Sequence, residues 1–316
     1  LPAICGGADP DLSRVLQQRL KKQFEAIMVS TKVVDMKEAG EQISVTFESA
    51  DGTKSDALYD RVLVSVGRRP NTADLGLENT GVKVGDDGFV EVDAQRRTAE
   101  ASIFAIGDVA GQPMLAHKAT YEGKIVAEVL AGKKSIYDPR AIPAVVFTDP
   151  EIAWCGLTED EARREGLDVR CGVFPWEASG RAATLHSSDG VTKIVADAEN
   201  GRVLGVGIAG PHAGELIGEG VLAIEMGAVA EDLALTIHAH PSLSETIMEA
   251  ADNIWSWKQD EDLYRICWLY YEGSSSLDGE WIESGSPTSL TLDPGEGFWY
   301  RHRGVSPWTW TPPLPY

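Results

Sequence analysis

Apolar positions divide the 316-residue chain into a half where helix and strands mix and a half dominated by short strands. From residue 9 to 23 they recur every three or four residues after Asp9-Pro10-Asp11, which predicts an amphipathic helix. Short β-branched runs predict strands at 26–29, 31–34, 43–47 and 61–66. The last run, Arg61-Val62-Leu63-Val64-Ser65-Val66, is typical of a strand buried on both faces, and Gly67 to Pro70 end it.

From residue 142 to about 252 the chain shows short apolar strands separated by glycine or aspartate, with helices between them. Strands are predicted at 145–147, 152–155, 169–174, 191–195 and 203–209. Thr158 and Glu161 have the spacing of a capping box, so a helix is expected to begin after Thr158. An apolar face predicts a second helix over 213–226. This pattern predicts an α+β domain with a mixed or antiparallel sheet.

Charge and cysteine usage restrict the class of partner. The formal net charge of −21 argues against nucleic acid, whose phosphates require a basic surface. No apolar run approaches the ~20 residues of a membrane-spanning helix, so no membrane association is expected. The four cysteines, Cys5, Cys155, Cys171 and Cys267, lack metal or redox spacing and suit a reducing cytoplasm, as buried side chains or free thiols.

The segment His238-Ala239-His240-Pro241-Ser242-Leu243-Ser244-Glu245 has the layout of a base and the group that orients it. Pro241 is suited to the first position of a helix, and the two serines can accept from free amides in its first turn. A carboxylate bonded to one imidazole nitrogen fixes the tautomer and raises the basicity of the other nitrogen. The alternative interpretation is a helix cap with a surface histidine.

Residues 98–109 contain a second candidate site, where a short apolar strand ends in Gly107-Asp108. Glycine lets a ligand approach the backbone, and an aspartate at a strand's carboxyl end can bond sugar hydroxyls. The pair also suits an ordinary turn. After Met114-Leu115-Ala116-His117 a helix is predicted through Glu122 and Glu128, and its N-terminus can stabilise negative charge.

Together these segments resemble the flavoprotein disulfide reductases, and among them the dihydrolipoyl dehydrogenases. Thr148-Asp149-Pro150-Glu151 and the run 174–182 belong to the resemblance, and the latter favours dihydrolipoyl dehydrogenases over glutathione and mercuric reductases. The resemblance covers roughly residues 1–252 and implies an α/β and α+β fold. It places the second half of an NAD-binding domain at 1–75, the C-terminal part of an FAD-binding domain at 76–140 and a dimerisation domain at 141–252.

The resemblance implies FAD and NAD as cofactors and a role for each candidate residue. His240 is the implied catalytic acid/base and Glu245 its orienting carboxylate, acting on the disulfide of the partner in a homodimer. The implied cofactor-binding residues are Gly107, Asp108, Met114, Leu115, Ala116 and His117 for FAD, and Val33 and Gly67 for NAD. Ordinary strand-end roles for Val33 and Gly67, and a loop position for His117, are the alternatives.

Two parts of the family pattern are absent upstream of these segments. The chain begins Leu1-Pro2-Ala3, without the Gly-x-Gly-x-x-Gly loop that grips a pyrophosphate and without a Cys-x-x-x-x-Cys pair. We therefore expect that a beginning is missing. The chain alone is expected to be inactive, because without the disulfide the substrate's electrons have no route to the flavin.

Residues 253–316 do not resemble the family, and we expect a small β-rich tail there. Short strands are predicted at Leu290-Thr291-Leu292 and from Gly297 to Tyr300. Seven of the nine tryptophans lie here: Trp255, Trp257, Trp268, Trp281, Trp299, Trp308 and Trp310. A sugar-binding surface is one interpretation, since tryptophan faces stack on apolar ligand faces. The others are a structural β-unit and a misjoined reading frame.

The resemblance thus implies an oxidoreductase that oxidises dihydrolipoamide through a disulfide and FAD to NAD, present here as an inactive fragment. It implies a lipoyl-bearing acyltransferase of a 2-oxo acid dehydrogenase complex as partner. Two other functions stay open: a non-catalytic dimerisation or binding module, and a sister flavin disulfide reductase with another substrate.

Overall fold

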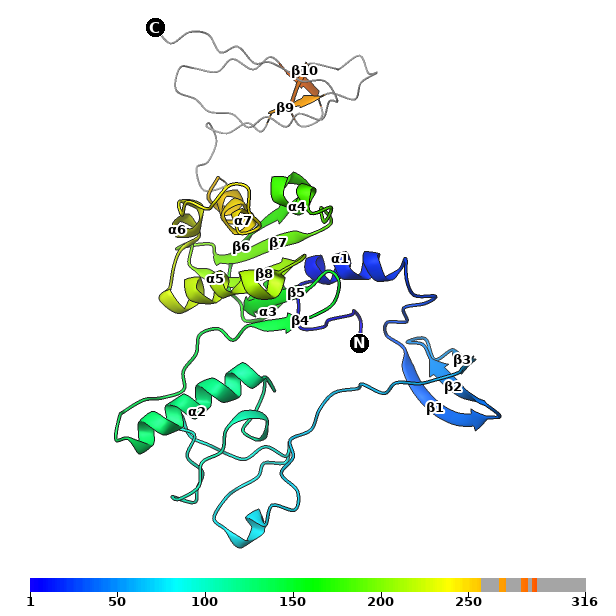
Figure 1. Ribbon diagram of the computed structural model, residues 1–316, viewed down its shortest axis with the longest axis vertical. Helices are drawn as coiled ribbons and strands as arrows, with labels where there is room; N and C mark the ends of the chain where they lie inside the picture. The colour runs from blue at the N-terminus through cyan, green and yellow to red at the C-terminus, as the bar shows by residue number, and fades with distance from the viewer. Residues whose placement is uncertain (257–266, 271–279, 284–285, 289–316) are drawn as a thin grey trace. The chain divides into compact units, whose positions relative to one another are not determined.

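The computed structural model describes residues 1–256, 267–270, 280–283 and 286–288, and the chain forms two compact units, Leu1–Trp255 and Ser256–Tyr316 (Figure 1). The helices are α1 (Pro10–Leu20), α2 (Ala116–Leu130), α3 (Glu159–Arg164), α4 (Gly180–Thr184), α5 (Ala213–Met226), α6 (Ala230–Ala234) and α7 (Glu245–Ser256). Three short 3₁₀ helices are η1 (Leu77–Asn79), η2 (Gly107–Val109) and η3 (Trp176–Ala178).

A five-stranded antiparallel sheet forms the centre of residues 141–255. Its strands lie in the order β4-β5-β8-β7-β6, namely β4 (Ala144–Val146), β5 (Ile152–Gly156), β8 (Val203–Ala209), β7 (Val191–Asp197) and β6 (Val169–Pro175). The five strands and the helix over 213–226 predicted from the sequence are confirmed. The capping box is confirmed as well, because the Thr158 hydroxyl accepts from the Glu161 amide and Glu161 accepts from the Thr158 amide.

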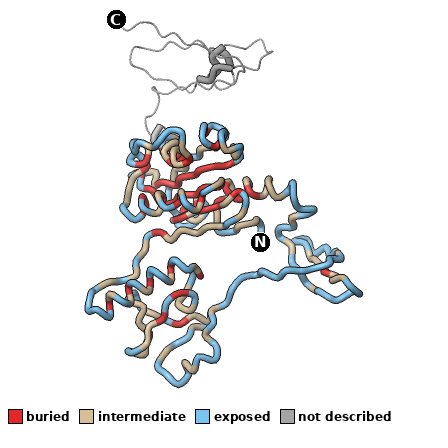
Figure 2. The backbone as a smooth tube through the Cα atoms, in the orientation of Figure 1, coloured by how far each residue is buried: buried red, intermediate tan, exposed pale blue. Residues whose placement is uncertain are grey.

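Helices cover both faces of this sheet, because successive strand residues point to opposite sides. On β5, Ile152 packs with Leu12 and Leu16 of α1, whereas Ala153 belongs to the core that includes Ile217 of α5. The tube in Figure 2 shows the central strands as the most continuously buried part of the chain. The mixed α and β architecture predicted from the sequence is confirmed.

Two close approaches in this domain require glycine. A Cβ at Gly172 of β6 would overlap the carbonyl of Ala250 in α7, so strand and helix lie in direct backbone contact. The run Gly205-Val206-Gly207-Ile208-Ala209-Gly210 has the spacing of a phosphate-binding loop but lies along β8 and its end. A Cβ at Gly205 would overlap the Leu157 carbonyl, so packing explains its glycine.

The first 75 residues form α1 and an antiparallel sheet of β1 (Lys32–Ala39), β2 (Gln42–Glu48) and β3 (Lys54–Tyr59). The predicted helix at 9–23 and the strands at 31–34 and 43–47 are confirmed, and β3 was not predicted. The strands predicted at 26–29 and 61–66 are wrong, since both segments are irregular. Leu63 and Val66 are 92% and 91% exposed, because no strand among the described residues pairs with them.

Residues 76–140 are mostly irregular apart from α2, which confirms the helix predicted after His117. The apolar strand predicted before Gly107 is wrong: Phe104 forms one isolated bridge with Arg97, and η2 follows at once. In the second unit, β9 (Cys267–Tyr270), β10 (Glu280–Glu283) and β11 (Ser286–Thr288) form an antiparallel sheet in the order β11-β10-β9. The strands predicted at 290–292 and 297–300 lie outside the described residues.

Candidate functional site

His240 and Glu245 lie in contact at the start of α7. The Nδ1 atom of His240 is 2.7 Å from Oε1 of Glu245, and the Ser242 amide donates to Oε2 of the same carboxylate at 2.7 Å. The helix begins at Glu245, so the prediction that Pro241 occupies its first position is wrong. Buried Leu243 anchors the chain just before the helix, and its carbonyl accepts from the Thr246 amide in the first turn.

This geometry leaves one nitrogen of His240 free. Since the carboxylate is an acceptor, Nδ1 carries the proton that it donates to Glu245, and the lone pair of the neutral ring then lies on Nε2. Nε2 has no hydrogen-bond partner among the described residues, and the side chain is 73% exposed. The pair is therefore able to accept a proton from a group that approaches from outside the chain.

A buried chain of hydroxyls fixes the start of α7. Trp176 Nε1 donates to Thr192 Oγ1 at 2.9 Å, Thr192 Oγ1 donates to Thr246 Oγ1 at 2.8 Å, and Thr246 Oγ1 donates to the Leu243 carbonyl at 2.7 Å. Trp176, Thr192 and Thr246 are fully buried. The sequence drew attention to the run around Trp176 only through a resemblance, and no local pattern reveals its partners.

The first histidine of the pair, His238, lies in a different setting. Its Nδ1 atom is 2.8 Å from the Thr236 carbonyl, and its Nε2 atom is 2.8 Å from Oε1 of Glu219 on α5. The side chain is only 7% exposed. Both ring nitrogens are thus engaged within the chain, and His238 has no nitrogen left to act on a substrate.

Gly107 and Asp108 form a turn that is held by the buried charged side chains of Glu122 and Lys118. The Gly107 amide donates to Glu122 Oε2 at 2.6 Å, and Lys118 Nζ donates to the Gly107 carbonyl at 3.0 Å. Lys118 and Arg96 also pair with Glu122 Oε1 at 3.2 and 3.3 Å. Glu122 and Lys118 were not predicted as site residues, although their four-residue spacing on a helix is a recognisable pattern.

The residues around this turn fit a flavin. The Asp108 carboxylate is 49% exposed, and its ion pair among the described residues is a long one, 3.9 Å, with Arg68. The first three amides of α2 have no acceptor among the described residues, and no side chain caps the helix at Leu115. An exposed carboxylate beside a free helix N-terminus suits sugar hydroxyls and an anionic ring.

The four residues predicted at 114–117, just before and at the start of α2, lie in different environments. Met114 is buried, Leu115 is the residue that precedes the helix, and Ala116 begins it. His117 is exposed, and its Nε2 atom lies 2.7 Å from the Pro143 carbonyl. Val33 on β1 is 54% exposed, and Gly67 has a left-handed φ of 117° with open space around its Cα. Their assignment to NAD stays a prediction.

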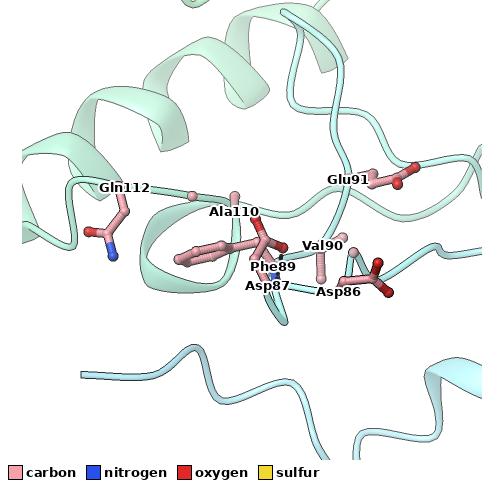
Figure 3. A pocket seen from close by; sticks show the side chains of 9 residues that line it. Asp86, Asp87, Phe89, Val90, Glu91, Ala110 and Gln112 are labelled. Atoms are coloured by element: carbon pink, nitrogen blue, oxygen red, sulfur yellow. Dashed lines mark hydrogen bonds between the residues drawn. The ribbon is translucent and has the colours of Figure 1, made fainter. Parts of the chain in front are cut away.

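A cavity of about 660 Å³ lies beside the loop that follows η2. Figure 3 shows its labelled side chains, among them Asp86, Asp87 and Glu91, on the segments 85–91 and 110–112. Gly107 and Asp108 do not line this cavity, and no described contact of its carboxylates indicates a ligand.

Cys5, Cys155 and Cys171 are free thiols, as the sequence predicts. Burial raises the pKa of Cys155 to about 12, and burial together with the nearby Glu159 carboxylate raises the pKa of Cys171 to about 12. Neither thiol is therefore a nucleophile near neutral pH.

None of the helices in the described part of the chain is long and apolar enough to cross a membrane.

Comparison with known proteins shows the class to which this fold and site belong. Residues 1–123 match the model of the pyridine nucleotide-disulphide oxidoreductases, and residues 142–251 match the model of their dimerisation domain. The chain belongs to the pyridine nucleotide-disulphide oxidoreductase family. The expected flavin and pyridine nucleotide are cofactors of this family.

Its curated relatives include dihydrolipoyl dehydrogenases, in agreement with the resemblance found in the sequence. The chain is 48% identical over 245 residues to dihydrolipoyl dehydrogenase of Vibrio cholerae, covering 78% of this chain and 51% of that protein. It is 47% identical over 253 residues to that of Thermus scotoductus, covering 80% and 55%. The chain thus spans about half the length of these relatives.

Two solved structures have folds similar to that of this chain. LpdA from Mycobacterium tuberculosis matches with a TM-score of 0.69 and 30% identity, over 77% of this chain and 52% of that one. The HOCl-induced flavoprotein disulfide reductase RclA from Escherichia coli matches with a TM-score of 0.70 and 28% identity, over 79% and 56%.

Proposed function

We propose that this chain is the C-terminal part of a dihydrolipoyl dehydrogenase-type enzyme, which oxidises dihydrolipoamide through a disulfide and FAD to NAD. The contact between His240 and Glu245 is the observation that supports it most directly. Glu245 keeps the proton on Nδ1, so Nε2 takes the proton of a substrate thiol. The resulting imidazolium is stabilised by the same carboxylate.

The flavin part of the proposal rests on the Gly107-Asp108 turn and the start of α2. Bound FAD would supply the acceptor for the electron pair that the substrate's sulfur atoms give up through the disulfide. Asp108 would hold its sugar hydroxyls, and the backbone from Met114 to His117 would lie against its ring. Lys118 donates a hydrogen bond to the Gly107 carbonyl and Glu122 accepts one from the Gly107 amide, so the two side chains hold the turn in place. For NAD we assign contacts to Val33 and Gly67, and we derive no step through it.

A homodimer is the assembly that we propose, with the base of one copy serving the disulfide of the other. Large apolar side chains are exposed on α5 and on the segment that leads to His240: Leu222, Met226, Leu235 and Ile237 are 62%, 75%, 66% and 96% exposed. A group of exposed apolar residues of this kind marks an interaction surface. Because His240 is exposed on the same segment, a second copy would bring its disulfide to the base.

The oligomeric state tests this assembly. The 316-residue chain is expected to sediment as a dimer, and Leu222→Glu with Met226→Glu is expected to give a monomer. The matched control is Leu130→Glu, an exposed leucine at the end of α2. A monomeric wild-type chain would contradict the proposed assembly.

The decisive test of function uses the chain joined to an upstream region that supplies the Gly-rich loop and the Cys-x-x-x-x-Cys pair. His240→Gln is expected to lower the dihydrolipoamide-dependent reduction of NAD by a factor of about 10²–10⁴, the usual contribution of a general base. His186→Asn serves as control, because asparagine tolerates the left-handed backbone of that residue. Unchanged turnover in His240→Gln would favour a sister reductase with another substrate.

The chain by itself is proposed to be inactive and to be purified without flavin. Stoichiometric FAD in the purified chain would contradict this view of its missing parts. If the joined protein binds FAD but transfers no electrons, the second candidate function, a dimerisation module, is favoured.

We further propose a lipoyl-bearing acyltransferase as the binding partner of the complete protein and the cytoplasm as its location. A pull-down with a lipoylated domain tests the partner, with the unlipoylated domain as control.

A further inference from the structure

The segment that carries His240 has little backbone support. From Ile237 to Ser242, no amide or carbonyl forms a backbone–backbone hydrogen bond within the described part of the chain. Fixing the backbone of each residue costs conformational entropy. Other contacts therefore have to hold these six residues in place, and the described ones are made by side chains.

Two of these side-chain contacts belong to His238. Its Nδ1 atom faces the Thr236 carbonyl and its Nε2 atom faces the Glu219 carboxylate, each at 2.8 Å. Both partners are hydrogen-bond acceptors, so a ring nitrogen that carries a proton donates it to the atom that it faces, and the carboxylate is the stronger acceptor of the two. Glu219 is the charged group that contacts His238 among the described residues. The ring is 7% exposed, which strengthens such a bond.

The bond to Glu219 joins the segment to a different element of the domain. Glu219 lies on α5, three residues before Leu222, whose exposed side chain belongs to the proposed dimer surface. On its other side the segment is held by the Glu245 carboxylate and by buried Leu243. His240 lies between these two attachments, and Glu245 is the hydrogen-bond partner of its side chain among the described residues.

We propose that His238 is a positioning residue: paired with Glu219, it ties the segment around His240 to α5 and thereby sets the direction of the imidazole. The two histidines then have separate tasks, His238 as the link to α5 and His240 as the free base. This inference rests on the proposed function only for the role of His240. The link itself is a property of the chain.

The test compares Glu219→Gln with Glu215→Gln in the 316-residue chain. Glu215 lies on the same helix, is exposed, and has no side-chain bond to a described residue. In NMR spectra, the Nε2 signal of His238 is expected to show the hydrogen bond to the Glu219 carboxylate in the wild type and in Glu215→Gln. In Glu219→Gln, this Nε2 signal is expected to shift because a neutral amide replaces the charged acceptor, and His240 is expected to change from one tautomer to a mixture.

Amide exchange gives an independent measurement. The Ser242 amide, held by Glu245, is expected to exchange about tenfold faster in Glu219→Gln, as for the loss of about 1.4 kcal/mol of hydrogen bonding to a charged group. Exchange at Ile208 in β8 is expected to stay unchanged, which shows that the domain remains folded. Unchanged Ser242 exchange and His240 signals, or equal effects in Glu215→Gln, would overturn the proposal. Neither readout requires turnover, so a failure of the proposed function remains distinguishable.

Discussion

The carboxylate of Glu245 holds His240 and the main chain at once: Oε1 lies 2.7 Å from His240 Nδ1, and Oε2 accepts the Ser242 amide at 2.7 Å. One side chain thus orients the ring and fixes the backbone that bears it. The imidazole has little freedom left when it meets a thiol, and such positioning lowers the entropic part of a reaction barrier.

Replacing Glu245 by glutamine tests this double role. The amide of Gln offers one acceptor oxygen, so the variant cannot keep both bonds. The free energy of unfolding is expected to fall by about 1.5 kcal/mol, the lower limit for a hydrogen bond to a charged group. Urea denaturation of the chain measures it, with Glu215→Gln as the matched control. Unchanged stability of Glu245→Gln would show that the lost bond does not contribute to the folded state.

The buried hydroxyl chain leads to a second prediction. Thr192→Val keeps the shape of the side chain but removes the group that links Trp176 Nε1 to Thr246. A buried donor without an acceptor costs about 1–3 kcal/mol, and this loss is expected in the free energy of unfolding. Exposed Thr184, whose hydroxyl contacts only neighbours in its own helix, provides the control. Thr184→Val is expected to change stability by less than about 0.5 kcal/mol.

Residues that are close in sequence account for what could be predicted. Thr158 and Glu161, and likewise His240 and Glu245, are three and five residues apart, so local spacing reveals each pair. His238 and Glu219 are 19 residues apart, and Thr192 and Thr246 are 54 apart. Those contacts depend on how the strands and helices pack, and no short pattern encodes that.

The segment Arg61–Val66 shows why an apolar run can mislead. Its composition is that of a strand buried on both faces, but burial also requires neighbouring strands on either side. Among the described residues none pairs with it, and Leu63 remains 92% exposed. The pattern specifies which residues favour a strand, whereas the sheet that would receive them is a property of the surrounding chain.

The contact between β6 and α7 leads to a third prediction. In Gly172→Ala the new methyl group would overlap the Ala250 carbonyl, which cannot move without shifting α7 and, with it, Glu245. We expect a loss of about 3 kcal/mol, at the upper end for overpacked sites. Gly180→Ala is the control, because open space surrounds that residue in α4. Thermal unfolding followed by circular dichroism measures both, and equal melting temperatures for the two variants would contradict the packing argument.

Lys193 leads to the last prediction, which concerns stability and pH. Its buried ammonium contacts Asp9 at 3.2 Å, Asp11 at 2.8 Å and Glu159 at 2.6 Å, and so joins α1, β7 and α3. Burial acts to lower the pKa of Lys193, but its bonds to these carboxylates outweigh burial and raise the pKa, and the same hydrogen bond lowers the pKa of Glu159. Burial raises the pKa of Asp9 although Lys193 opposes the change. Removing the lysine would leave buried Asp9 without its cation.

Lys193→Met is therefore expected to lower the free energy of unfolding at pH 7 by about 3–5 kcal/mol, the cost of breaking a buried ion pair. Because the folded-state pKa of Glu159 is lowered, its contribution is present above the unfolded pKa and is lost as pH falls through the folded value. The difference between wild type and Lys193→Met should thus narrow in acid. Arg163→Met removes an exposed cation from the same Glu159 and is expected to cost less than about 1 kcal/mol. Urea denaturation between pH 7 and about pH 2 measures all three proteins, and a difference that stays constant over this range would contradict the role given to the carboxylates.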